Sequence, residues 1–280
     1  MRRKEKRKLE RFSTYVLQMS IAIIFVLPLV WMIVSSFKPE ADIFKDMTSI
    51  ATFSLKNPTI NNYVEMFSRS FIIRGILNSI GYISLILLIG IPVNALCGYA
   101  LARLKFPGKN IILSLIIALY IVPFETVILP LYLVSNTLKI TNTFFALFLP
   151  FVANSFNIFL FRQFFMSLPK ELEEAAKIDG CGALSTFVRI VLPNTKPVIA
   201  TATVLTVVSQ WSDFMWPLIA VTSSQYKTVQ VAIQGFFTDP PVRYGPIMAA
   251  LVFTTIPIII VFLFLQKYYV EGIMSSGIKG

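Results

Sequence analysis

The chain has 280 residues, of which 56% are hydrophobic and only 14% are charged, and 25 of them are phenylalanine. A soluble globular domain carries about 25% charged residues, so this composition excludes a soluble protein and predicts a chain that lies in a membrane. The chain contains no histidine, which excludes histidine-based catalysis and most zinc sites. Its two cysteines, Cys97 and Cys181, are too far apart for a local metal motif and indicate no disulfide framework.

The N-terminal segment combines positive charge with a long apolar run. Seven Lys or Arg residues precede Phe12, and the run extends from Thr14 to Phe37. A signal peptide would have an apolar core of about 7–15 residues and a small-residue cleavage site after it. This run is longer, at about 23 residues, and no such site follows. We therefore expect a basic cytoplasmic segment at residues 1–13, followed by an uncleaved transmembrane helix.

Five further apolar stretches follow the first one, at about residues 76–101, 110–133, 142–164, 197–221 and 245–266. They predict an all-α, polytopic membrane protein with six transmembrane helices in a domain of residues 14–266. An even number of spans places both termini on one side. Of the 25 Lys and Arg residues, 17 fall in the two terminal segments and the loops 102–109 and 162–196, whereas 7 fall in the other loops and Arg74 lies at a boundary.

This asymmetry places both termini in the cytoplasm, because cytoplasmic loops carry an excess of Lys and Arg. We interpret the net charge of +11 as a signal of topology rather than of nucleic-acid binding.

The spans contain features that are typical of packed membrane helices. Gly90, Asn94 and Gly98 share one face of the second span, where small residues allow close approach and an Asn can form a hydrogen bond to a neighbouring helix. A helix tolerates prolines in a membrane where its neighbours satisfy the carbonyls that proline frees. Six prolines interrupt the spans: Pro28, Pro92, Pro123, Pro130, Pro217 and Pro257.

The cytoplasmic loop 165–196, between the fourth and fifth spans, predicts a short helix, a glycine turn and a second short helix. Three acidic residues lie where the positive end of the first helix dipole is expected, and Gly180 suits a left-handed cap at its other end. We expect Leu172, Ala175 and Ala176 to form one face that a partner surface can approach closely. The second helix has an amphipathic pattern that Pro193 is expected to end: Leu184, Phe187, Val188 and Val191.

This loop resembles the EAA loop of ABC importer permeases at every fixed position of that motif: Glu174, Ala175, Ala176, Gly180, Ile190, Leu192 and Pro193. Three other stretches resemble the carbohydrate-uptake, maltose-type subfamily of these permeases. They are residues 98–109, 210–218 and 267–272, and the likeness covers about residues 14–280.

The resemblance implies a transport subunit rather than an enzyme. The loop helix would be a coupling helix that docks on a separate ATPase, and the ATPase-coupling residues would be the motif residues together with Asp179. The chain has no G-x-x-x-x-G-K-[ST] phosphate loop, so two cytoplasmic ATPase subunits would bind the ATP and this chain would need no cofactor. A second homologous permease chain would complete the pore as a heterodimer in the lipid of the bacterial cytoplasmic (inner) membrane. An extracellular or periplasmic sugar-binding protein would deliver the solute.

Two acidic residues lie within apolar spans, Glu125 and Asp213, and ionisable groups at such positions are candidates for function. With Gln210 and Trp211 they offer hydrogen-bonding and ring surfaces that suit a sugar, so we expect these four residues to line a substrate pathway. A structural role near the membrane interface is the alternative.

The tail 267–280 is either a disordered terminus or, by the family likeness, a segment that reaches into the ATPase dimer. An ion-coupled secondary transporter is the alternative function, although no convincing internal repeat supports it. An intramembrane enzyme is less well supported, because no nucleophile with its base stands out.

Overall fold

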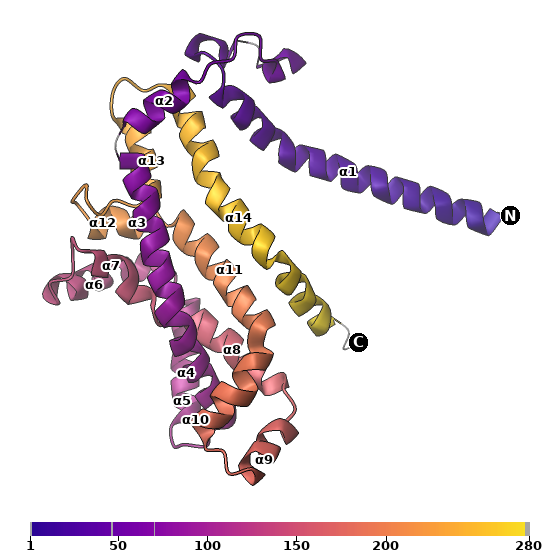
Figure 1. The fold of residues 1–280 in the computed structure, drawn as a ribbon, viewed down its shortest axis with the longest axis vertical. Helices are drawn as coiled ribbons and strands as arrows, with labels where there is room; N and C mark the ends of the chain where they lie inside the picture. Colours follow the sequence, from indigo (N-terminus) through magenta and orange to yellow (C-terminus); the bar gives the residue numbers. More distant parts are fainter. Residues whose placement is uncertain (1, 46, 70, 278–280) are drawn as a thin grey trace. The chain divides into compact units, whose positions relative to one another are not determined.

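The computed structural model describes residues 2–45, 47–69 and 71–277, and within these ranges it contains helices and turns but no strand. The predicted all-α fold is therefore confirmed. The chain divides into two compact units, Met1–Ile72 with Ile233–Thr255, and Ile73–Ala232 with Ile256–Gly280. Figure 1 shows the helices, coloured by their order in the chain.

The first unit begins with the long helix α1, whose apolar segment Arg11–Ser36 has no buried residue in its most apolar window. Asn62 closes the end of α1, because its side-chain Nδ2 donates to the carbonyls of Ser36 and Lys38 at 2.9 and 2.8 Å. The helical segments of this unit are α1 (Arg2–Ser36), η1 (Glu40–Asp42), η2 (Ile50–Phe53), α2 (Asn61–Ser68) and parts of α13 (Val229–Thr238) and α14 (Tyr244–Gly277).

The second unit contains the remaining helices, and its most extensively packed pair is α4 with α8. Its α-helices are α3 (Phe71–Leu85), α4 (Ile91–Arg103), α5 (Lys109–Ile121), α6 (Phe124–Thr137), α7 (Phe144–Phe148), α8 (Ser155–Ser167), α9 (Glu171–Ile178), α10 (Ala183–Thr186), α11 (Lys196–Ser212) and α12 (Met215–Ala220).

The small-residue face of α4 packs as predicted. A Cβ atom added at Gly98 would lie 2.7 Å from the Cβ of Phe161 on α8, so only glycine permits this approach. Asn94 is 1% exposed, and its Nδ2 donates to the carbonyl of Val152 while its Oδ1 accepts from the backbone N–H of Asn154. The side chain thus satisfies the open backbone just before α8 begins.

Two π-helical turns, η3 (Ile86–Gly90) and η5 (Phe187–Val191), each come directly before a proline turn, at Pro92 and at Pro193. A proline lacks an N–H and its ring collides with the carbonyl four residues earlier, so a wider turn at this point lets the helix continue. Both spans therefore pass their prolines without a break.

The number of spans is five, or six if one bent pair is counted as a single span. Five segments are long and apolar enough to cross a membrane: Arg11–Ser36, Phe71–Arg103, Phe144–Ser167, Ala183–Ser212 and Tyr244–Gln266. The third predicted span, 110–133, counts as one span only if α5 and α6, which meet at an angle of 108° beside Pro123, are taken together as a broken span. Whether the termini are cytoplasmic stays a prediction.

Two further boundaries differ from the sequence-based expectation. The fifth span does not run unbroken to residue 221, because α11 ends at Ser212 and α12 begins at Met215. The helix α14 does not end near residue 266 but continues to Gly277, so most of the predicted tail continues this helix. Residues 278–280 lie outside the described residues.

Candidate functional site

The loop 165–196 has the helix and glycine turn that the sequence predicts. Helix α9 ends in a left-handed residue, Gly180, with φ of +78°. The N–H of Gly180 donates to the carbonyl of Lys177 at 3.0 Å, and the N–H of Cys181 donates to the carbonyl of Ala176 at 2.9 Å. These two bonds are the pair that defines a Schellman C-cap, which satisfies the last carbonyls of the helix. The turn after α9 therefore has a defined, hydrogen-bonded geometry.

Helix α9 has an inner and an outer face. Ala176 is 1% exposed and packs inward, whereas Ala175 is exposed. The prediction that Leu172, Ala175 and Ala176 share one accessible face is therefore wrong for Ala176. The outer face instead runs from Leu172 through Ala175 to Ile178, residues at i, i+3 and i+6, and Ile178 is 87% exposed. Glu174 and Asp179 are also exposed.

An ion pair that the sequence-based reasoning missed connects α9 to the end of α4. The Nε of Arg103 lies 2.7 Å from the Oε1 of Glu173, and the side chains are only 8% and 14% exposed. The Nε–H of Arg103 is not aligned for a hydrogen bond to the Oε1 of Glu173. The Nη2 of Arg103, however, donates to the carbonyl of Leu168 at 2.6 Å. The hydroxyl of Tyr99 lies 3.4 Å from the Oε2 of Glu173. One arginine therefore holds both the start of α9 and the residue that ends α8.

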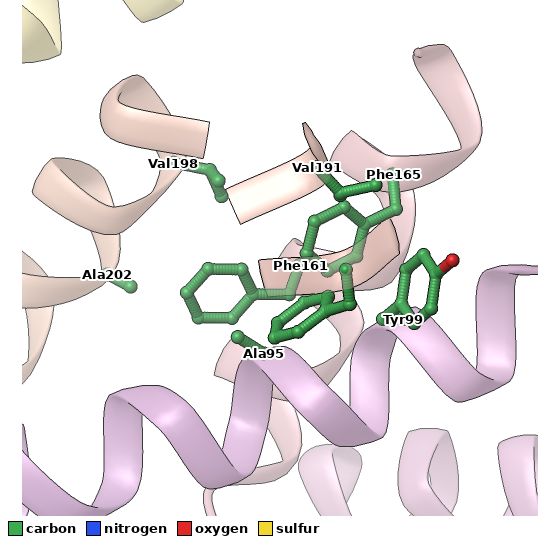
Figure 2. Close-up of a cluster of buried hydrophobic side chains, with 8 residues drawn as sticks. Ala95, Tyr99, Phe161, Phe165, Val191, Val198 and Ala202 are labelled. Carbon is green, nitrogen blue, oxygen red and sulfur yellow. The ribbon is translucent and has the colours of Figure 1, made fainter. Parts of the chain in front are cut away.

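A cluster of buried side chains lies beside this ion pair and joins α4, α8, η5 and α11. Figure 2 shows its labelled members, with the hydroxyl of Tyr99 directed away from the other rings. The Tyr99 ring lies 5.0 Å from the ring of Phe187 and 5.7 Å from that of Phe165, measured between centroids. The second half of the loop is thus packed against three other helices. The buried cluster consists of Ala95, Tyr99, Phe161, Phe165, Phe187, Val191, Val198 and Ala202.

The second half of the loop is not the amphipathic helix ended by Pro193 that the sequence suggested. It consists of the short α10, the π turn η5 and the 3-10 turn η6 (Leu192–Thr195), and it leads directly into α11. The carbonyl of Ile190 accepts from the Nδ2 of Asn194 at 2.7 Å, and that of Leu192 accepts from the Oγ1 of Thr195 at 2.6 Å. These side chains satisfy carbonyls around Pro193, so the chain keeps a helical course.

The second unit also contains a cavity of about 830 Å³. It is lined by the end of α5, one face of α6, the segment 150–154, the first turn of α8 and one face of α11. Gln210 is among its lining residues, whereas the other three predicted pathway residues, Glu125, Trp211 and Asp213, are not. The structure therefore does not bring the four residues together at this cavity.

The three remaining pathway candidates have other surroundings. Glu125 is exposed in the first turn of α6. Trp211 is 3% exposed, and its carbonyl accepts from the Nε2 of Gln230 at 3.0 Å. Asp213 lies at the break between α11 and α12, and its Oδ1 accepts from the N–H of Trp216 at 3.4 Å, which is the geometry of a helix cap. Among the described residues, no group of three or more cysteine or acidic side chains could hold a metal ion.

Comparison with known proteins matches residues 90–274 to the family "binding-protein-dependent transport system inner membrane component". The arabinooligosaccharide transport permease AraQ of Halalkalibacterium halodurans is 31% identical over 93% of this chain and 93% of its own length. The trehalose/maltose transport permease MalG of Thermococcus litoralis is 32% identical over 93% of this chain and 94% of its own.

The fold matches a chain in the crystal structure of a bacterial ABC transporter that imports the acidic polysaccharide alginate. The TM-score is 0.81 at 22% identity, over 94% of this chain and 97% of that one. The predicted multi-pass location in the inner membrane agrees with the family description and the apolar spans. The chain belongs to the family of binding-protein-dependent transport system inner membrane components, as the resemblance of its loop to ABC importer permeases predicted.

Proposed function

We propose that this chain is the permease subunit of an ATP-driven carbohydrate importer, and that its loop 165–196 couples it to a separate ATPase. The family description supports a binding protein as the source of the solute. The names of the relatives, which transport arabinooligosaccharides and trehalose or maltose, support a carbohydrate as that solute. A second homologous permease would complete the pore, two ATPase subunits would bind the ATP, and the C-terminal tail would reach into the ATPase dimer.

The outer face of α9 carries this proposal. Four of the eight residues of α9 are charged, so this helix belongs in water rather than in lipid. Even so, Leu172 is 42% exposed and Ile178 is 87% exposed, with the small Ala175 between them. We take this small apolar patch on a water-facing helix as the contact surface for the ATPase. Glu171 and Glu174 border this patch and offer ion pairs to a basic partner surface.

The inner face of α9 explains how docking would reach the membrane spans. Glu173 is paired with Arg103 at the end of α4, and Ala176 is buried. The π turn η5 that follows packs its Phe187 against Tyr99 of α4 and Phe165 of α8. A movement of the docked loop would therefore displace α4, α8 and α11 together, which is what alternating access to the pore requires.

The test is the substitution Ala175→Asp. The new carboxylate would lie in the docking contact beside Glu174 and Asp179, and an unpaired buried charge can cost several kcal/mol, which weakens docking about a thousandfold. The amount of ATPase captured with the affinity-tagged permease should fall to background, while the membrane abundance of the permease stays unchanged. Insertion depends on the apolar spans and flanking charges, and the substitution leaves these as they are.

Two matched variants control this experiment. Ala41→Asp makes the same change at another exposed alanine between two acidic residues, in η1, and should leave ATPase capture intact. Ala176→Asp puts a carboxylate on the inner face and should lower the abundance of the protein itself, because Ala176 is buried. Full ATPase capture and normal uptake by the Ala175→Asp protein would contradict the docking role of this loop.

A further inference from the structure

The cavity of the second unit has the size of a small-molecule site. Its volume of about 830 Å³ lies within the range of roughly 300–1,000 Å³ that such sites occupy. Helix α6 faces it with residues spaced three or four apart, and the break before α6 leaves the end of α5 on its rim. The 108° bend between α5 and α6 therefore helps to form this space.

One part of the lining is polar and built from two helices. The N-cap of α8, Asn154, and its first turn, with Asn157, contribute one half, and α11 contributes Thr206 and Gln210. The Nδ2 of Asn157 donates to the Oγ1 of Thr206 at 3.0 Å, and the Oδ1 of Asn154 accepts from the N–H of Asn157 at 2.9 Å. These bonds fix the positions of three side chains, and Ser155 and Ser209 add hydroxyls to the same lining.

Gln210 is the residue whose hydrogen bonds are incomplete. Gln210 is only 8% exposed, and the Oε1 of its side chain is buried without a hydrogen-bond partner among the described residues. The hydroxyl of Tyr82 donates to the backbone carbonyl of Gln210 and holds the residue in place. A buried acceptor without a partner is unfavourable, so a solute hydroxyl in the cavity would gain this bond once the side chain of Gln210 turns its Oε1 toward the cavity.

The other part of the lining is aromatic. The rings of Tyr120 and Phe156 lie 5.2 Å apart, and those of Phe124 and Phe151 lie 6.0 Å apart, measured between centroids. The C–H face of a sugar ring packs on such surfaces because the face of an aromatic ring is electron-rich. Amides and hydroxyls beside aromatic rings are thus the combination that a carbohydrate uses.

Every residue that lines the cavity is uncharged. An anionic solute would leave its hydration shell here without a cation to replace it, and a buried unpaired charge is strongly unfavourable. We infer that this cavity is a solute site for an uncharged oligosaccharide, which Gln210 and the ring of Tyr120 contact, and that it excludes acidic glycans. The inference rests on the proposed function and names the substrate class of this chain's own part of the pathway.

The experiment measures uptake by intact cells that produce the chain with its native partners. Radiolabelled arabinotriose and maltotriose serve as uncharged probes, and an alginate trisaccharide serves as the acidic probe. Wild-type cells should import an uncharged probe and not the acidic one. The variant Gln210→Leu should lower that uptake about tenfold, which corresponds to the loss of about 1.4 kcal/mol, and Tyr120→Leu should lower it similarly. The matched control Gln234→Leu changes an exposed residue of α13 and should leave uptake unchanged.

Two results would overturn the inference: import of the acidic probe at the rate of the uncharged ones, or wild-type uptake by both cavity variants. Gln210→Leu loses no hydrogen bond of the Oε1, and Tyr120 is 58% exposed, so both proteins should reach the membrane in normal amounts, which immunoblotting checks. Failure of the proposed function would differ, because wild-type uptake would then resist depletion of ATP by arsenate and stop when an ionophore collapses the ion gradient.

Discussion

Gly180 is the residue at which backbone conformation, rather than space, requires glycine. A Cβ atom added there would meet no atom within 4 Å, but the φ of +78° lies in the left-handed region. An L-residue with a side chain pays about 1–2 kcal/mol for that conformation. Gly182, two residues later, also has open space around it, but its φ is −72°. The two glycines therefore separate the effect of conformation from that of size.

We predict that Gly180→Ala loosens the end of α9 and that Gly182→Ala does not. A strain of about 1–2 kcal/mol raises the population of the opened turn about 5- to 30-fold. Trypsin cleaves such a turn from its opened form, so the rate of cleavage after Lys177 in the purified protein should rise by that factor. Mass spectrometry of the fragments gives the rate at Lys177. Equal rates in the two variants would show that the left-handed residue does not hold the turn.

The sequence predicts the left-handed cap at Gly180 but not the ion pair of Glu173. A left-handed glycine cap is a local feature, and its signal lies within a few residues of the helix end. The partner of Glu173 is Arg103, which is 70 positions away and comes close only because α4 packs along α8. Glu171, Glu173 and Glu174 look alike in the sequence, and only the packing distinguishes the paired glutamate from the exposed ones.

The ion pair of Arg103 with Glu173 is the charged link between α4 and α9, beside the hydrogen bond that the hydroxyl of Tyr99 donates to Glu173. Removal of one member leaves the other charge largely buried, which costs about 3 kcal/mol for a pair of this kind. We predict that Glu173→Gln lowers the thermal unfolding midpoint of the detergent-purified protein by several degrees. The same variant should also release the ATPase more readily, since the start of α9 would lose its ion pair with α4.

Glu171→Gln is the matched control, because Glu171 lies in the same first turn of α9 and is exposed. It should unfold at the wild-type temperature. The double variant Arg103→Glu with Glu173→Arg restores opposite charges and should recover part of the loss. If Glu173→Gln and Glu171→Gln unfold at the same temperature, the ion pair contributes nothing and the buried cluster alone positions the loop.

The sequence predicts the apolar length of the spans, but it does not show which of their six prolines breaks a helix. Residues 110–133 form one apolar run, but Pro123 pushes the preceding Val122 into an extended conformation, with ψ of 123°, and α6 then starts in a new direction. Pro92 and Pro193 also lie within apolar spans, yet their helices continue through π turns. A proline permits a break, and the packing around it decides whether the break occurs.

The molecule as a whole has a charge distribution that predicts its orientation in the membrane. Of its Lys and Arg residues, 17 lie in the segments assigned to the cytoplasm and 7 in those assigned outside. The coupling role of the loop 165–196 depends on this orientation, because an ATPase is available only on the cytoplasmic side. A solute site in the cavity, by contrast, does not depend on which side of the membrane the termini occupy.

We predict that residues before α2 are accessible from outside the cell and that the end of α8 is accessible only from inside. Ser54 and Ser167 are both exposed serines, so Ser54→Cys and Ser167→Cys form a matched pair of probes. Each is placed in a protein whose Cys97 and Cys181 are replaced by serine. A membrane-impermeant maleimide should label Ser54→Cys in intact cells, and it should label Ser167→Cys only after permeabilisation. Neither substitution alters a Lys or Arg, so the charges that set the topology are unchanged. Labelling of Ser167→Cys in intact cells would place the loop outside and remove it from contact with any ATPase.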